Sequence, residues 1–439
     1  MNGDSGRDTR DEGKEGPKHL IILHHGMWGW SGHMRFVAKR LQDRYGHHVV
    51  VYKSSSNAFI RSYHGILVCG YRLMKEVIAL RARNPTADRI SMIGYSAGGI
   101  IVRHTIALLY KSGIIGNGKN QLRPINFVSL ATPHCGIRRS PDKFIHRCYN
   151  GILYFLVYFL AGDTGQELAL IDTPCLEGSE DRLGKFQHLM KKPLLVRMAD
   201  PDGVHAKALR AFDRKLIYAN AINDRMVPYP TASASTRPLY TTYNDQFSAI
   251  FSPSLPSPPP ARPTDPNLPS YPHILAVTPS KAQMKETGSK GLLGSGAWAV
   301  RVEVRLQERV WATMISLLVY AIILTLTPLV LTMLTIFRLL SLLWADPEEI
   351  QQAMDSNTDL YYTKESALNG LSSPSKAKRL EGDEVADYES EIAQNLQDIG
   401  FYRVDVYLPG LNTHPVIVGR RGRGGEHVIQ HLVDHMSIH

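Results

Sequence analysis

A series of short apolar runs, rich in β-branched residues, constrains the fold of this chain most. Such runs are typical of strands that are buried on both faces of a parallel sheet. The stretches between them are longer, and residues 63–83 have the apolar spacing of a helix. Strands and helices that alternate in this way predict a parallel sheet covered by helices on both faces. The expected strands are 19–23, 48–52, 89–93, 126–130 and 215–219.

The sequence changes in character after residue 219. Residues 252–274 hold so many Pro and Ser residues that we expect a linker without a packed core. No charged residue occurs from Val310 to Phe337, and a helix of that length would extend ~42 Å, more than the ~30 Å hydrocarbon core of a bilayer. Residues 346–390 are polar, which predicts loops. The last expected elements are strands at 403–407 and 415–419 and a helix at 427–436.

Composition limits the cellular setting and the class of partner. The four cysteines lie far apart without a CxxC pair, and the first 17 residues are polar, so we expect free thiols and a reducing, cytosol-facing location. The net charge of +10 favours anionic partners. Because the basic residues are scattered, without zinc-finger spacing or an RNP-like motif, a phospholipid surface is favoured over nucleic acid.

The segment Gly94-Tyr95-Ser96-Ala97-Gly98-Gly99 lies between the expected strand 89–93 and a helical run at 100–110. A strand, a sharp turn and a helix in this order form a nucleophile elbow, in which small neighbours leave the serine hydroxyl exposed. Ser96 is therefore the predicted nucleophile, and the backbone N–H of Ala97 would face the developing oxyanion. The alternative is a glycine-rich helix start that packs closely or binds phosphate.

The loop after the first expected strand reads His25-Gly26-Met27-Trp28-Gly29. In folds with a nucleophile elbow this loop supplies a second N–H to the oxyanion, and Met27 is the candidate. Glycine at position 26 would let the backbone approach the substrate. We expect Gly26, Trp28 and Tyr95 to contact substrate. An ordinary glycine turn with a buried tryptophan is the alternative.

A carboxylate should orient the histidine that removes the proton from the serine hydroxyl. In α/β-hydrolases the chain order is Ser, acid, His. Asp224 follows the expected strand 215–219 and is the candidate acid. Its competitors are Asp200 and Asp202, which follow the strand-like LLVRM at 194–198.

The candidate base is His414, which lies between the expected strand 403–407 and the last helix. That is where the final member of such a triad belongs. Four of the alternatives lie on or beyond the last helix, with a spacing that suggests a solvated or metal-capable face, of which the solvated face is favoured. The alternatives are His273, His427, His431, His435 and His439.

Several ordered motifs resemble the lipase-like serine esterase family of the α/β-hydrolase superfamily, which is widespread in fungi and plants. The motifs are HHGMWGWSGHM at 24–34, HGILVCGYRL at 64–73, GYSAGGIIVR at 94–103, LATPHCGI at 130–137, AGDTGQELALID at 161–172 and YANAINDRMVPYPTAS at 218–233. Some members act as phospholipases or monoacylglycerol lipases at lipid droplets, so the resemblance implies a lipid ester as substrate. It also implies Ser96 as nucleophile, Asp224 as acid and the His414 segment as base. Tyr95 and Ala97 replace the more usual His and Leu of the family.

The predicted fold is an α/β-hydrolase with a mostly parallel central sheet, helices on both faces, and a membrane-associating apolar helix or hairpin inserted before the final strand segment. Residues 149–162 are too short to span a bilayer, so they form either a buried helix or, as we favour, an interfacial cap over the site. A single span at 310–337 would separate Ser96 from His414, so we expect a hairpin that bends near Pro328. A true span and a buried helix are the alternatives.

These expectations divide the chain into segments. They are a disordered N-terminus (1–17), a hydrolase core (18–240) with a cap-like insertion near 140–190, a Pro/Ser-rich linker and loop (241–300), a membrane-associated apolar segment (301–345), a polar loop region (346–395) and the C-terminal part of the core (396–439).

The expected activity is hydrolysis of carboxylic esters in membrane or storage lipids through an acyl-enzyme on Ser96. A lipid substrate and a membrane or lipid-droplet surface are the expected partners, at the endoplasmic reticulum or a lipid droplet. No cofactor or metal is predicted. Arg420, Arg421 and Arg423 could contact a phosphate, although a solvated basic loop is the favoured interpretation. A thioesterase or acyltransferase with the same triad, and a catalytically inactive membrane scaffold, are the alternatives.

Overall fold

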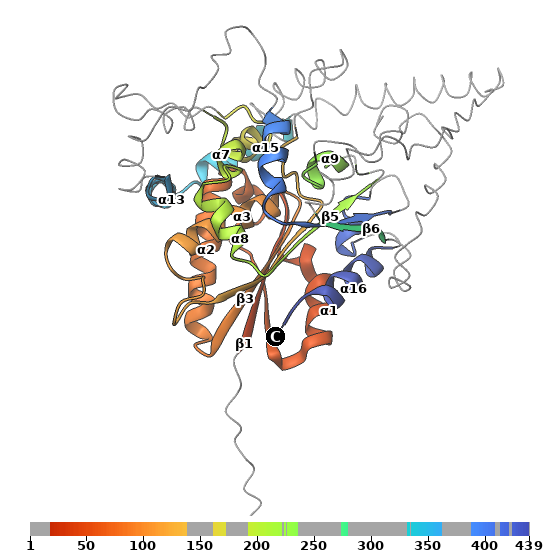
Figure 1. Ribbon diagram of the computed structural model, residues 1–439. Coiled ribbons are helices and arrows are strands. Elements are labelled where there is room, and N and C mark those ends of the chain that lie inside the picture. The colour runs from red at the N-terminus through yellow and green to blue at the C-terminus, as the bar shows by residue number, and fades with distance from the viewer. Residues whose placement is uncertain are drawn as a thin grey trace, which may run out of the picture.

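The computed structural model describes residues 18–137, 161–172, 192–221, 224, 226–235, 332–333, 335–361, 388–408, 413–420 and 424–438, and the backbone of 274–279. Within these residues the centre is a seven-stranded sheet in the order β2-β1-β3-β4-β5-β7-β6 (Figure 1). Neighbouring strands from β2 to β7 are parallel, and β6 pairs antiparallel with β7. The strands are β1 Lys18–His24, β2 Val49–Lys53, β3 Ala87–Tyr95, β4 Arg123–Leu130, β5 Arg214–Asn220, β6 Ile274–Pro279 and β7 Tyr402–Val406.

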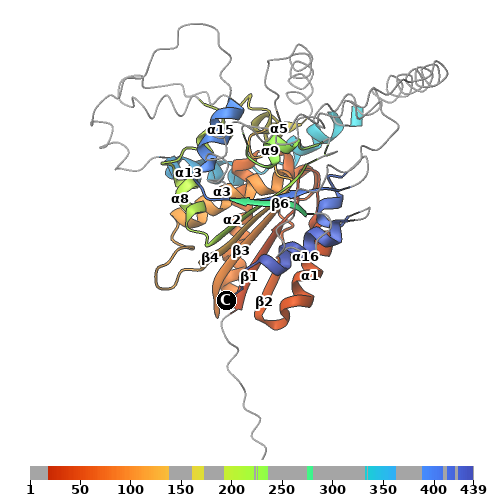
Figure 2. The ribbon, with the colours of Figure 1, turned by 45° about the vertical axis from the view of Figure 1, so that its right-hand side comes forward.

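The central strands are buried on both faces, as their apolar runs predict. In β1, Leu20 and Ile22 belong to one core and Ile21 and Leu23 to the other, because successive side chains of a strand point to opposite faces. One core lies under α2 (Ile66–Arg83), α3 (Ala97–Lys111) and α8 (Val204–Arg210), and the other under α1 (Arg35–Tyr45) and α16 (Gly425–His435) (Figures 1 and 2). The prediction of a mostly parallel sheet with helices on both faces is confirmed.

Four predictions of secondary structure were wrong. The run 415–419 contains the 3₁₀ helix η6 (Val416–Val418), and LLVRM is the helix α7 (Leu194–Met198). A short apolar run cannot by pattern alone be assigned to a strand or a buried helix. The region 346–390 begins with α13 (Pro347–Tyr361), and the Pro/Ser-rich region includes β6.

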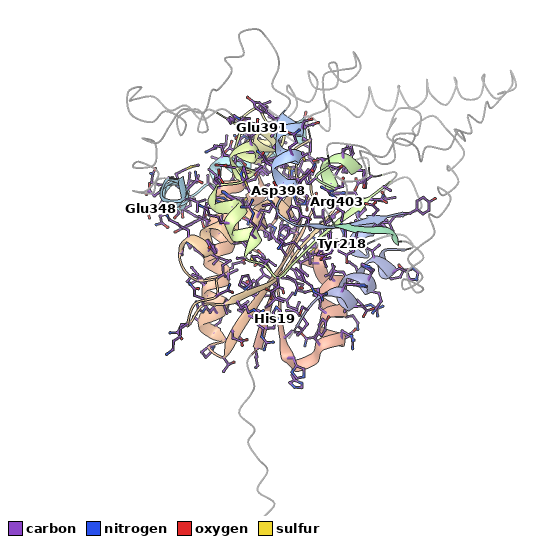
Figure 3. All side chains as sticks on the ribbon, in the orientation of Figure 1. His19, Tyr218, Glu348, Glu391, Asp398 and Arg403 are labelled. Carbon is purple, nitrogen blue, oxygen red and sulfur yellow. The ribbon has the colours of Figure 1, made fainter. Side chains whose placement is uncertain are left out.

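The remaining described elements connect these layers. They are η1 Ser31–Met34, η2 Gly46–His48, η3 Phe59–Tyr63, α5 Gly162–Leu168, α9 Tyr229–Ala232 and α15 Tyr388–Gln397. Arg403 of β7 is buried and donates to the backbone oxygens of Ser233 at 2.6 Å and Ala234 at 3.0 Å, so it ties the end of α9 to the sheet (Figure 3).

Some predicted segments lie outside the described residues: the N-terminus at 1–17, most of the cap-like insertion near 140–190, and most of the apolar segment 310–337. None of the helices in the described part of the chain combines the length and hydropathy that a bilayer crossing requires. Of the predicted free thiols, Cys69 and Cys135 are described; both are buried, and Cys69 is a free thiol.

Two carboxyl groups lie between α5 and its neighbours. Glu167 of α5 is buried, and its Oε2 accepts from the N–H of Ile66 at the start of α2. Asp172 is partly buried, and its Oδ2 accepts from the N–H of Leu194 at 2.7 Å. Burial raises the pKa of Asp172 to about 7. Burial, and then the nearby charge of Asp172, raise the pKa of Glu167 well above its usual value.

We expect Asp172→Asn to flatten the dependence of stability on pH. Between about pH 4 and 7 the unfolded chain loses a proton that the folded carboxyl keeps, so this group lowers the free energy of unfolding as pH rises, by up to about 1.4 kcal/mol per pH unit. Asparagine retains an oxygen for the Leu194 N–H but does not titrate. Urea unfolding at pH 5 and 7 should show a smaller loss of stability in the variant, and an equal loss in both proteins would contradict the prediction.

Candidate active site

Three candidate residues from distant parts of the chain meet at one edge of the sheet. Ser96 follows β3, Asp224 follows β5, and His414 follows β7. These strands run parallel, so their carboxyl ends lie at the same edge, where ligand-binding residues of α/β sheets gather. The structure therefore brings the predicted nucleophile, acid and base together.

The backbone at Ser96 is sharply bent between β3 and α3. Ser96 has φ 55° and ψ −136°, a conformation that L-residues rarely adopt and that the surrounding structure must stabilise. A side chain at position 98 would not fit, because its Cβ would lie 2.9 Å from Nδ1 of His24. Ser96 is partly exposed although its neighbours are buried. The segment has the geometry of a nucleophile elbow.

His414 bridges the serine and the aspartate. Its Nε2 lies 2.9 Å from Oγ of Ser96, and its Nδ1 lies 2.8 Å from Oδ2 of Asp224. The other carboxylate oxygen, Oδ1, accepts from the backbone N–H groups of Met226 at 3.0 Å and Val227 at 2.9 Å. These two donors orient the carboxylate. With Nδ1 donating to Asp224, Nε2 is free to accept the hydroxyl proton of Ser96.

The alternative acids and bases have other positions. Asp200 accepts from the N–H of Asp202 at 3.2 Å, within a turn after α7. His431 is fully buried against Tyr218, with 2.9 Å between Nδ1 and Oη, so the expectation of a solvated face was wrong for this residue. His273 and His439 lie outside the described residues.

Tyr95 contacts His414 through both its hydroxyl and its ring. It was expected to contact substrate, but it is almost fully buried, and its hydroxyl donates to the backbone oxygen of His414 at 3.2 Å. The two rings also pack with centroids 5.0 Å apart. Burial raises the pKa of Tyr95, so its hydroxyl remains a donor.

A buried amide connects the loop of His414 to the sheet. The Nδ2 of Asn220, at the end of β5, donates to Oγ1 of Thr413 at 2.6 Å, and its Oδ1 accepts from the N–H of Leu408 at 3.2 Å. These contacts hold both ends of the segment between β7 and His414. Sequence reasoning missed Asn220, although its place directly after the strand run 215–219 was a signal.

We expect Asn220→Leu to lower kcat for a short-chain ester by about 10- to 100-fold and to leave KM nearly unchanged. Leucine has a similar volume but cannot hold Thr413, and a misplaced imidazole slows proton transfer more than substrate binding. Thr413→Val removes the hydrogen bond to Thr413 but leaves that to Leu408, so it should have a smaller effect. A folded Asn220→Leu protein with the kcat of the wild type would rule out this positioning role.

The predicted oxyanion donors lie on neighbouring segments. Ala97 is the first residue of α3, so its N–H has no acceptor within the helix. Gly26 packs against Ser96, and a Cβ at that position would lie 2.7 Å from Cβ of the serine. Met27 follows it and is partly buried. The structure thus places the Met27 loop beside the elbow.

A buried network behind this loop was also missed from the sequence. Burial lowers the pKa of His24, which keeps its ring neutral. Its Nδ1 lies 2.6 Å from the backbone oxygen of His25, and its Nε2 lies 3.0 Å from the amide nitrogen of Asn57, which also donates to Cys69 O. These contacts fix the carbonyl just before Gly26.

Trp28 lies at the surface beside this site. Its side chain is 45% exposed, so the alternative of a buried tryptophan was wrong. Its backbone N–H donates to Oγ of Ser62 at 2.9 Å, and its ring lies 6.2 Å from that of Tyr63. Of the predicted basic group, Arg420 is partly buried, whereas Arg421 and Arg423 lie outside the described residues.

Comparison with known proteins gives a family for this chain. Residues 14–236 match the model of the family described as "Putative serine esterase (DUF676)". "Putative lipase ROG1" of Saccharomyces cerevisiae is 30% identical over 232 residues, which are 52% of this chain and 30% of that protein. "Putative lipase C4A8.10" of Schizosaccharomyces pombe is 27% identical over 222 residues, which are 49% of this chain and 26% of that protein. The matches thus span less than a third of these relatives' length.

Among solved structures, a bromoperoxidase from Bacillus anthracis is 18% identical, with a TM-score of 0.26, over 49% of this chain and 78% of that chain.

Proposed function

Because this chain belongs to the DUF676 serine esterase family, we propose that it hydrolyses carboxylic ester bonds of lipids through an acyl-enzyme on Ser96. The hydrogen-bonded series from Ser96 through His414 to Asp224, with distances of 2.9 and 2.8 Å, is the observation that supports this most. A hydroxyl at a sharp bend, next to an oriented imidazole, is what general-base activation of serine requires.

The proposed reaction has two halves. Oγ of Ser96 attacks the acyl carbon while Nε2 of His414 takes the hydroxyl proton, and the N–H groups of Met27 and Ala97 bind the oxyanion. The intermediate then collapses: the bond to the leaving alcohol breaks, and His414 gives that oxygen its proton. Water repeats these steps on the acyl-enzyme, and its attack releases the acid and restores Ser96. Asp224 holds His414 throughout.

A lipid is the proposed substrate, and two observations support it. The curated relatives carry lipase in their names. Large apolar side chains are exposed on the connections at the sheet edge that carries Ser96: Trp28 after β1, Phe59 at the start of η3 after β2, and Met226 after β5, with exposed fractions of 45%, 58% and 59%. In the proposal Gly26 and Trp28 contact the acyl part of the substrate. The proposed place of action is a cytosol-facing membrane or lipid-droplet surface.

Labelling by a fluorophosphonate probe tests the nucleophile. The wild-type protein should be labelled, and Ser96→Ala should not. Ser112→Ala is a matched control, because Ser112 lies at the end of α3 and donates only to a local carbonyl. Labelling that persists in Ser96→Ala, or that is absent from the wild type, would contradict the proposal.

Product analysis tests the reaction class. The purified protein should release free acid from acylglycerol or phospholipid dispersions. Added alcohol should not divert most of the acyl group, as it would in an acyltransferase, and thioesters should react more slowly than oxygen esters. Release of acid only from thioesters would overturn the substrate class and leave the nucleophile in place.

A further inference from the structure

The helical residues directly before α13 expose almost all of the apolar side chains that the structure describes there. Residues 335–343 are helical, and the chain turns at Trp344. Leu343 and Trp344 are exposed to 78% and 68%, whereas Ser341 is buried. The exposed apolar residues of this segment are Met333, Ile336, Phe337, Leu339, Leu342, Leu343 and Trp344.

The five of these side chains that lie at 335–343 surround more than half of the helix. At about 100° per residue they span an arc of roughly 220°, whereas the apolar stripe of a helix packed on a protein is often little more than about 100° wide. A protein surface docks against one side of a helix. A fluid lipid layer can contact such a wide arc at once, as it does around helices that lie in a membrane interface.

The helix is attached firmly on its remaining side. Arg72 donates to Nδ1 of His64 at 2.7 Å, so Nε2 of His64 carries the proton and donates to the backbone oxygen of Ser341 at 3.0 Å. Arg338 forms an ion pair of 3.2 Å with Asp163 of α5. In Figure 2 the segment, coloured cyan, lies beside α5. The outward direction of its apolar arc is therefore set by the hydrolase core.

Local contacts connect the residue that holds the helix, His64, to the loop beside the candidate active site. His64 follows Tyr63, which packs near Trp28, and Trp28 N–H donates to the adjacent Ser62. The N–H of the exposed Phe59 donates to the carbonyl of Gly29 at 2.8 Å. The exposed residues Trp28 and Phe59 are thus connected to the helix through the buried residues Ser62, Tyr63 and His64.

Charges next to the helix do not favour an anionic surface. The cation within it, Arg338, is paired with Asp163, and the nearby Arg61 lies 3.3 Å from Glu349. The exposed acidic residues Asp346 and Glu348 come directly after the helix, and Figure 3 labels Glu348. Attraction to lipid would therefore come from burial of apolar side chains, which does not depend on the charge of the headgroup.

We propose that this docking face, made of the exposed residues of 333–344 together with Trp28 and Phe59, inserts into a zwitterionic phospholipid surface. Insertion would bring the sheet edge that carries Ser96 toward the lipid, so that an acyl ester could reach the hydroxyl without crossing water. This inference rests on the proposed function for its substrate, although the binding itself needs no intact Ser96.

Flotation of the full chain with phosphatidylcholine vesicles tests the docking face. Leu339→Ser combined with Leu343→Ser should weaken partitioning at least about 10-fold, since two large apolar side chains no longer enter the lipid. Ile78→Ser and Tyr110→Ser are matched controls, because these exposed apolar residues lie on α2 and α3 outside the docking face. They should float like the wild type, and so should Ser96→Ala.

Headgroup charge should change wild-type binding by less than about threefold when anionic lipid is added or salt is raised. Binding only to anionic vesicles would overturn the zwitterionic assignment.

Fluorescence quenching separates this face from any other lipid contact of the chain. Vesicles of brominated phosphatidylcholine should quench the emission of the wild type, and Trp344→Phe should remove part of the quenched signal while flotation persists. Equal flotation of the double Leu variant and the wild type would overturn the proposal, and so would an unchanged quenched signal in Trp344→Phe. A dimer that the double variant dissociates, with unaltered flotation, would assign the face to a second copy of the chain.

Activity distinguishes this inference from the proposed function. The ratio of vesicle-lipid hydrolysis to hydrolysis of a soluble short-chain ester should fall at least about 10-fold in the double Leu variant. If the wild-type protein binds vesicles and its fluorescence is quenched, but it hydrolyses no ester, the proposed function is refuted and the docking face is retained. An active wild-type protein whose ratio the variant leaves unchanged would refute the docking face alone.

Discussion

Ser96→Ala, His414→Ala and the double variant should all lower kcat for ester hydrolysis by a similar factor, on the order of 10⁶. Attack by the hydroxyl and removal of its proton are one event, and the two groups lie 2.9 Å apart. Once either group is lost, the other has no partner to act with. The residual rate comes from the oxyanion donors and substrate binding, which all three variants retain.

The comparison needs initial rates with one soluble ester and proof that each variant is folded. His47→Ala is a matched control, because His47 is exposed in η2, at the end of the sheet opposite Ser96, and should leave kcat unchanged. Single effects that multiply in the double variant would show that Ser96 and His414 act independently, which would contradict the proposed mechanism.

Asp224→Asn should lower kcat by about 10⁴-fold without unfolding the site. The N–H groups of Met226 and Val227 both donate to Oδ1, so an asparagine must keep its oxygen there and turn its NH₂ toward His414. A donor at that position forces the ring proton from Nδ1 to Nε2. The imidazole then offers Ser96 a donor and can no longer accept the hydroxyl proton.

Two measurements check this prediction. Steady-state kinetics should show the loss mainly in kcat, and nitrogen NMR of the imidazole should report a proton on Nε2 instead of Nδ1. Asp200→Asn is the matched control, because Asp200 only accepts a hydrogen bond within its own turn. Retention of most of the activity by Asp224→Asn, with the ring proton still on Nδ1, would assign the orienting role to another group.

Much of the parallel sheet could be predicted, because each buried strand is marked by an apolar run in the local sequence. A strand such as β1 places Ile21 and Ile22 in different cores, so its whole run must be apolar. The bend at Ser96 could also be predicted from the sequence, because a turn this sharp requires small residues next to the serine. Asp224 and His414 could be chosen by chain order and by their places after strand runs. In each case a few adjacent residues hold the information.

The elements that were missed depend on distant partners. Val416, Ile417 and Val418 are as apolar as a strand, but they form a 3₁₀ turn in the core under α1 and α16. The helix α13 lies in a polar stretch of sequence. Among its described residues, only Ala353 and Leu360 have buried apolar side chains. The position of α13 is stabilised by Glu349, whose carboxylate forms an ion pair of 2.7 Å with Arg72 of α2.

The supporting residues of the candidate site show the same division. Local sequence was sufficient for a strand, a tight turn and a serine between small neighbours, because backbone sterics act over a few residues. The geometry around that serine arises from contacts between residues far apart in the chain: the Tyr95 hydroxyl donates to His414 O, 319 positions away, and Asn220 donates to Thr413, 193 positions away. Which polar groups meet in a buried space depends on how β5 and β7 come to be neighbours, and that depends on the packing of the entire sheet.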